Sequence, residues 1–254
     1  MMHTEEEYIK LEEEELEITN ESILTMVLIL SSVEDNLEKE LRGFYQKYGK
    51  DGVVTYAEAR KWISERDHQR RLTALLLLVN GAFVGALADM ETHFRSFLTK
   101  VIGKESTFFG VEVDVEKILT RKWGADDLYW LQRLEKDVEL WNYRIIGDIR
   151  RAMLQRMTLD ELLSVVDGRF ASIMSVLKTL GLSESSAVGS ISRHAIFKEL
   201  GVSKYQFFTN PDERRCETCG DLHGLIFPMS AYEVGVTASP IHPRCRCWEI
   251  PIWD

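Results

Sequence analysis

Proline is confined to one end of this sequence of 254 residues, because all five prolines lie at or after position 211. Proline removes a backbone donor and breaks helices, so the proline-free stretch before that position can form long helices. The four cysteines share this distribution and lie between positions 216 and 247. The sequence therefore predicts a mainly α-helical protein, in which an elongated helical part is followed by a small, β-rich C-terminal α+β module.

Apolar residues recur every seven positions in the first helical stretch, at Ile23, Leu30, Leu37 and Phe44. This spacing predicts an amphipathic helix from about Asn20 to Gly49 that packs against a partner inside or outside the chain. The preceding residues 5–17 are mostly glutamate, which we interpret as a solvated helix face or frayed end rather than a core element. An acidic arm for a basic partner is the alternative.

One stretch, from Leu72 to Ala88, is apolar enough to be considered as a membrane span. It is short for a bilayer and contains Asn80, Gly81 and Gly85, so we expect a buried helix that ends near Gly103, and no membrane association. The sequence also lacks a readable secretory signal. We therefore expect the protein to be in a reducing compartment, where clustered cysteines hold metal more often than they form disulfides.

Local patterns predict further boundaries. Thr55 with Glu58 and Thr158 with Glu161 form capping boxes that begin helices. Alternating residues 111–115 indicate a short strand, and residues 123–127 a turn before a long helix whose apolar face runs to Met153. Gly181 is expected to end one helix and Ser183 to begin another, which ends at Gly201. Strands are expected at 205–209, 225–227 and 248–253.

These patterns divide the chain into three regions. Residues 1–117 form an N-terminal helical region with an acidic arm at 1–19. Residues 118–202 form a second helical part, and residues 203–254 form a zinc-binding, β-rich module.

The cysteine spacing is the strongest chemical signal. Cys216-x-x-Cys219 can direct two thiolates at one centre, and a second turn offers His242, Cys245 and Cys247. Two ligand sets are open: the four cysteines, which we favour because soft thiolates suit zinc, or Cys216, Cys219, His242 and Cys245. Either set is closed, which predicts a structural Zn²⁺ and no catalytic residue. Motifs of zinc deaminases, metalloproteases, phosphate-binding loops and serine hydrolases are absent.

Charge argues against a protein that coats nucleic acid, since the net charge is -10. Four arginines nevertheless surround the cysteines: Arg214, Arg215, Arg244 and Arg246. They are either phosphate or partner contacts, or cations that neutralise the thiolates. A zinc-containing nuclease that uses His223 and His242, or a DNA-binding accessory factor, is therefore the alternative to a protein without enzymatic activity.

The C-terminal third carries a family resemblance. Its residues are Phe197-Lys198-Glu199-Leu200-Gly201-Val202, Tyr205 and Phe207, the stretch from Asp212 to Pro228 that includes Cys216-x-x-Cys219, and Pro240-Ile241-His242-Pro243 before Cys245-Arg246-Cys247. Together they resemble the phage head morphogenesis family, the phage Mu protein F-like minor capsid proteins. The resemblance is specific over residues 185–254 and continues more weakly to about residue 118.

The resemblance implies a minor capsid protein that acts in procapsid assembly near the portal vertex and in packaging or delivery of the genome. Its expected partners are the portal protein and the major capsid or scaffolding protein, and packaged DNA in addition. Its expected location is the virion, in the head interior or at the portal vertex, after assembly in the host cytoplasm. One departure is visible: Leu182-Ser183-Glu184 stands where relatives often carry Arg-Thr-Glu.

Overall fold

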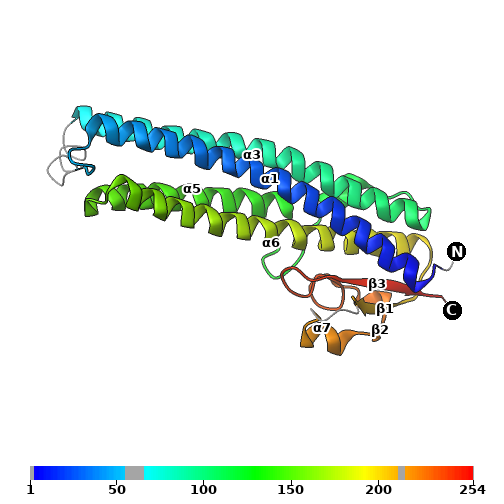
Figure 1. Ribbon diagram of the computed structural model, residues 1–254. Helices are drawn as coiled ribbons and strands as arrows, with labels where there is room; N and C mark the ends of the chain where they lie inside the picture. The colour runs from blue at the N-terminus through cyan, green and yellow to red at the C-terminus, as the bar shows by residue number, and fades with distance from the viewer. Residues whose placement is uncertain (1–2, 55–65, 211–214, 254) are drawn as a thin grey trace. The chain divides into compact units, whose positions relative to one another are not determined.

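The computed structural model describes residues 3–54, 66–210 and 215–253 (Figure 1). The long helices are α1 (Glu5–Tyr48), α3 (Arg66–Phe109), α5 (Trp130–Gln155) and α6 (Leu159–Glu199), and α4 (Val115–Leu119) is a short one. The C-terminal elements are β1 (Lys204–Thr209), α7 (Glu217–Leu222), β2 (Ile226–Pro228), a 3₁₀ turn (Met229–Ala231) and β3 (Cys247–Ile252). The expected class, mainly α with a small C-terminal α+β module, is confirmed.

Helix α1 begins at Glu5, so the acidic run is helical from its start. The expectation that this run is too acidic for the core is wrong for one face, where Tyr8, Leu11 and Glu15 are buried. The reason is a buried arginine, described below, that compensates the inward-facing carboxylates. The capping box expected at Thr55 and Glu58 lies outside the described residues.

Helix α6 is continuous, so the predicted break at Gly181 and the new start at Ser183 are wrong. The Ser183 hydroxyl donates to the carbonyl of Thr179 one turn earlier, at 2.8 Å, which satisfies it inside the helix. The capping box predicted to begin this helix at Thr158 is confirmed. The Thr158 amide donates to Glu161 Oε2 at 2.7 Å, and the Glu161 amide donates to Thr158 Oγ1 at 3.2 Å. The predicted glycine end is also confirmed at Gly201, with φ 70°.

Helix α3 continues to Phe109, beyond the expected end near Gly103. The strand expected at residues 111–115 is wrong, because residues 111–114 are irregular and α4 begins at Val115. Asp114 caps this helix by accepting a hydrogen bond from the Lys117 amide at 3.1 Å. The alternation arises instead because Val111 and Val113 pack on a hydrophobic cluster.

The chain forms two compact units, and each long helix contributes residues to both. The first unit contains residues 1–24, 92–133 and 178–254, and the second contains residues 25–91 and 134–177.

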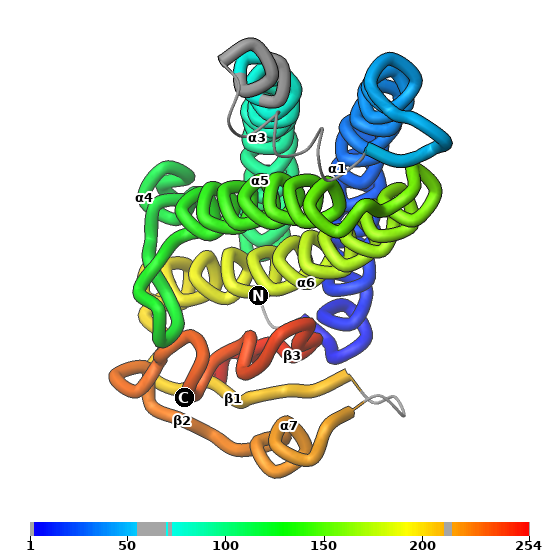
Figure 2. Tube along the Cα trace, turned by 90° about the vertical axis from the view of Figure 1, so that its left-hand side faces the viewer, coloured from blue at the N-terminus to red at the C-terminus, as the bar shows by residue number. Residues whose placement is uncertain are grey.

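The first unit contains a three-stranded antiparallel sheet in the order β2-β1-β3. The three strands expected from the sequence are confirmed within one or two residues. Tyr205 in β1 lies opposite Phe227 in β2 and Pro251 in β3. Figures 1 and 2 both place β3 next to the C-terminal part of α6. The core there includes Ile196, Phe197, Val202, Tyr205 and Tyr232.

The second unit is helical. The apolar face predicted for α5 is confirmed, because its members recur at helical spacing and are buried: Leu134, Val138, Trp141, Ile145, Ile149 and Met153. Phe83 of α3 stacks on Phe170 of α6 with ring centroids 6.2 Å apart.

The apolar segment at 72–88 is buried on one face only. Leu75, Val79 and Phe83 are buried, whereas Leu77 and Leu78 are 64% and 56% exposed. The expectation of a buried helix is thus only half right. Within the described residues, two helices, Glu5–Tyr48 and Thr73–Phe109, could cross a membrane by length and composition, although core helices of soluble proteins meet the same criteria.

Candidate metal centre

The first thiol pair is built by the short helix α7. Cys216 is the N-cap of this helix, and its Sγ accepts a hydrogen bond from the Cys219 amide at 3.4 Å. This local bond turns the two thiols toward the same side of the turn. Cys219 is buried, and all four cysteines are free thiols rather than disulfides.

The loop before β3 brings the second set of ligands to this turn. His242 Nε2 lies 3.2 Å from Cys216 Sγ and 3.3 Å from Cys219 Sγ. Cys245 Sγ lies 3.7 Å from Cys219 Sγ. Cys247 lies in a second group with Cys219 and Cys245, whose Sγ atoms are all within 4.8 Å of one another. The structure therefore brings all five candidate residues together around Cys219.

These separations fit a tetrahedral zinc ion. Zinc–sulfur and zinc–nitrogen bonds of about 2.3 and 2.0 Å imply about 3.8 Å between two sulfur ligands and about 3.5 Å between sulfur and nitrogen. The three measured separations of 3.7, 3.3 and 3.2 Å lie close to these values. The cluster could therefore hold a metal ion with little rearrangement.

The environment prepares some of these groups for metal and not others. A hydrogen bond from Cys247 lowers the pKa of Cys245 to about 5, and the Cys219 amide lowers the pKa of Cys216. Burial raises the pKa of Cys219 to about 12, and the hydrogen bond to Cys245 raises that of Cys247. Without a cation, Cys219 and Cys247 thus stay protonated. A bound metal ion would displace the proton of a thiol that coordinates it.

His242 is oriented by its own backbone. Its Nδ1 lies 2.9 Å from the carbonyl oxygen of Pro243, so the Nδ1 proton is donated there and Nε2 keeps its lone pair. This arrangement is typical of metal-binding histidines. Burial lowers the pKa of His242, but the Pro243 carbonyl and the nearby thiolates outweigh it and raise the pKa overall.

Three of the four predicted arginines lie at this centre. Arg215, Arg244 and Arg246 line a small cavity of about 30 Å³ together with Cys216, Cys219, His242 and Cys247. Arg214 lies outside the described residues. Arg244 is tied to α6, because its Nε donates to Thr179 Oγ1 at 2.8 Å and its amide to Ser183 Oγ at 3.2 Å.

His223 is used structurally. It is the C-cap of α7, and its Nδ1 accepts a hydrogen bond from the Thr209 amide at 3.2 Å. Its ring packs against Phe208 with centroids 4.7 Å apart. These contacts attach α7 to the end of β1.

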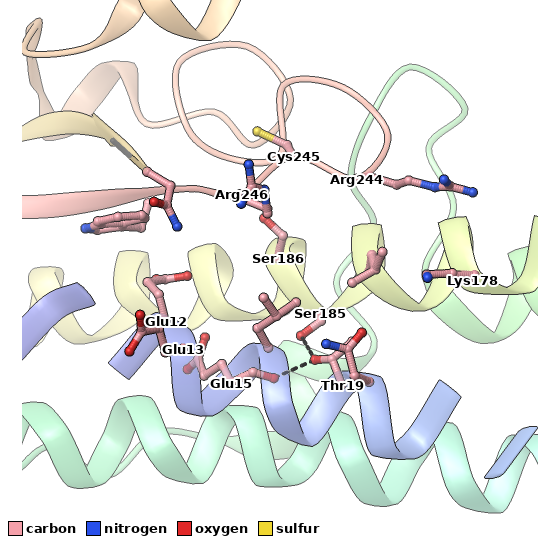
Figure 3. A pocket seen from close by; sticks show the side chains of 15 residues that line it. Glu12, Glu13, Glu15, Thr19, Lys178, Ser185, Ser186, Arg244, Cys245 and Arg246 are labelled. Carbon is pink, nitrogen blue, oxygen red and sulfur yellow. Dashed lines mark hydrogen bonds between the residues drawn. The ribbon is translucent and has the colours of Figure 1, made fainter. Parts of the chain in front are cut away.

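A larger groove of about 540 Å³ lies beside the centre in the first unit (Figure 3). Glu12, Glu13 and Glu15 of α1 line one side. Positive side chains line the other: Lys178, Arg244 and Arg246. Of these glutamates, Glu12 and Glu15 also pair with Arg193 of α6.

Sequence reasoning missed a buried ion cluster, which we call the Arg193 cluster. The side chain of Arg193 in α6 is only 3% exposed, and it pairs with Glu12, with Glu105 at 2.5 Å, and with Glu15 and Glu249 at 3.7 Å each. It joins α1, α3, α6 and β3 in the first unit. The spacing of Tyr8, Leu11 and Glu15 in the acidic run could have indicated an inward face.

Glu184 also gains a role. It is 1% exposed and accepts hydrogen bonds from Arg133 Nη1 at 2.6 Å and Trp123 Nε1 at 2.9 Å. The neighbouring Ser183 holds the Arg244 amide beside Cys245. Glu184 is thus paired with an arginine from α5.

Fold and site together define a helical protein with a C-terminal module built around a cysteine–histidine cluster. Residues 136–250 match the family model of phage Mu protein F like protein, so the chain contains a phage Mu protein F-like domain, as the resemblance predicted. This domain supports a capsid-related role in phage head morphogenesis, in association with other capsid components and with the virion. The family is structural, which is consistent with a protein without enzymatic activity. No curated protein and no solved structure matches the chain significantly.

Proposed function

We propose that this protein is a non-enzymatic minor capsid protein that acts in procapsid assembly near the portal vertex and in packaging or delivery of the genome. Its partners would be the portal protein and the major capsid or scaffolding protein. The phage Mu protein F-like domain at 136–250 supports this role. The protein would be assembled in the host cytoplasm and would remain in the virion, in the head interior or at the portal vertex.

The C-terminal module would be stabilised by a structural zinc ion held by Cys216, Cys219, His242 and Cys245. The position of His242 Nε2, 3.2 and 3.3 Å from two sulfurs, is the observation that supports this set over four thiolates. Four protein ligands leave no coordination position for water, so the ion would cross-link α7 to the loop before β3. Such an ion contributes on the order of 10 kcal/mol to folding.

Two features argue against the alternative of a nuclease or a DNA-binding factor. His223 is engaged by Thr209 and Phe208 and belongs to the packing of α7. The groove beside the arginines is lined by acidic as well as basic side chains, and the net charge of the chain is -10, which disfavours phosphate binding.

The function is tested in assembled particles. Particles are produced with the wild-type chain, with Cys216→Ser/Cys219→Ser, or with the matched control Glu217→Ser/Thr218→Ser, whose side chains are exposed in the same turn. We expect the wild-type chain and the control chain each to contain about one zinc and to be recovered with the portal or coat proteins. The cysteine variant should lose its zinc and should no longer be recovered with them. A wild-type chain that is absent from particles would refute the capsid role.

The alternative has its own measurement. Purified protein is incubated with DNA and divalent metals, and binding is followed at two salt concentrations. Cleavage that His223→Ala abolishes, or tight binding that salt weakens steeply, would favour the nuclease or the DNA-binding factor instead.

A further inference from the structure

One face of α3 is apolar and exposed in the second unit. Leu77, Leu78 and Val84 are 64%, 56% and 60% exposed. Small exposed residues continue the same face at spacings of three or four: Ala74, Gly81, Gly85 and Ala88. We call these seven residues the α3 stripe. An exposed continuous apolar stripe of about four helical turns is typical of an interaction surface.

The opposite face of α3 is already packed inside the second unit. Leu75, Val79 and Phe83 are buried, and Phe83 stacks on Phe170 of α6. At the edge of the stripe Asn80 accepts a hydrogen bond from Asn142 of α5 at 2.6 Å. Helix α3 therefore cannot turn the stripe inward without losing these contacts.

The two glycines are not packed against other described parts of the chain. A methyl group at Gly81 or Gly85 would meet no described atom within 4 Å outside the neighbouring helix backbone. Glycine is unfavourable inside a helix, and it is tolerated where another backbone approaches closely. Spaced four residues apart, the glycines form a shallow notch between the larger side chains of Leu77, Leu78 and Val84.

We propose that the α3 stripe binds the same stripe of a second copy of this chain, with the two helices antiparallel. A twofold axis through Gly81 pairs residues that are equally far before and after it. Leu77 of one copy then lies over the Gly85 notch of the other, and Ala74 lies over Ala88. The surface is therefore complementary to itself, as a twofold interface requires.

Charge selects the antiparallel arrangement. Exposed Arg70 lies in line with the stripe at its N-terminal end, whereas Asp89 and Glu91 are exposed at its C-terminal end. Antiparallel copies bring each positive end to the negative end of the other copy. A parallel pair would place Arg70 against Arg70 and Asp89 against Asp89, which is repulsive.

The interface is small. A stripe of roughly 20 Å buries less surface than a standard protein–protein interface, so the dimer is expected to be weak and to form at micromolar concentrations or above. This self-association does not depend on the capsid function proposed above.

Sedimentation equilibrium of the full-length, zinc-loaded protein over a concentration series tests the proposal. We expect a monomer–dimer equilibrium that Gly81→Glu weakens at least tenfold. Gly168→Glu is the matched control, because Gly168 is an exposed glycine in α6 with no atom within 4 Å of an added methyl group, and it should leave the equilibrium unchanged. Circular dichroism checks that both variants stay folded.

Orientation is tested with a photo-crosslinking amino acid at Ala74 in a mixture of isotope-labelled and unlabelled copies. Crosslinks between copies near Ala88 support the antiparallel dimer, and crosslinks near Ala74 overturn it. A wild-type monomer at all concentrations also overturns the proposal. So does a monomer that binds phosphatidylethanolamine–phosphatidylglycerol vesicles through the stripe, which would assign this surface to a membrane.

Discussion

Arg193 places one buried positive charge among four carboxylates, so the Arg193 cluster cannot be neutral while all of them are ionised. Burial raises the pKa of Glu12 to about 7 against the opposing effect of Arg193. Burial and the neighbouring Glu105 and Glu12 raise the pKa of Glu15 well above its ordinary value. The folded protein therefore holds protons on this cluster that the unfolded chain releases near pH 4.5.

This difference predicts how stability depends on pH. An acid whose pKa is raised by folding stabilises the folded state at low pH, and this contribution is lost as pH rises through the raised pKa. The free energy of unfolding should fall less between pH 5 and pH 8 in Glu15→Gln than in wild type. At pH 8 the variant should be at least as stable as wild type. Urea unfolding at each pH measures this.

Glu17→Gln is the matched control for that experiment, because Glu17 is an exposed glutamate of the same helix. Comparing each variant with wild type at the same pH and zinc concentration removes the contribution of the metal centre. A Glu15→Gln protein that loses as much stability with rising pH as wild type would contradict the argument.

The two candidate ligand sets differ at a single position, His242 or Cys247. If His242 is the fourth ligand, His242→Ala should weaken zinc binding by roughly 100-fold or more, whereas Cys247→Ser should change it by less than about tenfold. Competition with a chromophoric chelator measures both. The reverse order would assign the site to the four thiolates favoured by the sequence.

At the level of secondary structure, α6 shows that the same residue type has opposite effects at different positions. Gly168 lies in the interior of this helix, where an added methyl group meets no described atom within 4 Å outside the neighbouring helix backbone. Gly201 follows the end of the helix in the left-handed conformation, with φ 70°.

We therefore expect Gly168→Ala to stabilise the protein by about 0.5–1 kcal/mol and Gly201→Ala to destabilise it by about 1 kcal/mol. The first change improves helix propensity, and the second forces a Cβ atom into an unfavourable backbone region. Thermal unfolding of the two variants checks the prediction. If both variants were stabilised, or both destabilised, helix propensity and C-cap conformation would not control the stability at these two positions.

In the molecule as a whole, two hydrophobic clusters of described residues lie in the C-terminal module, and the thiols belong to the second of them. Tyr205 and Tyr232 pack with Ile196 and Phe197 of α6 in the first cluster. Phe207 packs with Cys219, Cys245 and Cys247 in the second. The sheet is thus attached to α6 through side chains remote from the metal centre in the sequence.

Removal of zinc should therefore loosen the module unevenly. After chelation we expect faster amide hydrogen exchange at residues 215–223 and 241–247, by at least tenfold, with much smaller changes in α5 and α6. Mass spectrometry of peptides before and after chelation measures this, and added zinc should reverse it. Uniform exchange over the whole chain, or none, would show that the ion does not support this segment locally.

Much of the fold was predictable because it rests on local patterns. The face of α5, the capping box at Thr158, the glycine at 201 and the three strands each depend on residues close in sequence. The break at Gly181 and the strand at 111–115 were wrong, because packing with distant residues outweighed local preference there. In the site, the spacing of the cysteines was informative, whereas nothing local showed that His242 Nε2 lies between Cys216 and Cys219.

By itself, the sequence determined the helical class, the position of the β-rich module and the family of its domain, since these follow from proline placement, periodicity and motif spacing. Only the tertiary structure decided that Glu12 and Glu15 turn inward to Arg193, that Arg133 pairs with Glu184, and that the apolar segment of α3 leaves one face exposed. Burial and charge pairing join residues that lie far apart along the chain, so their outcome depends on how the elements pack.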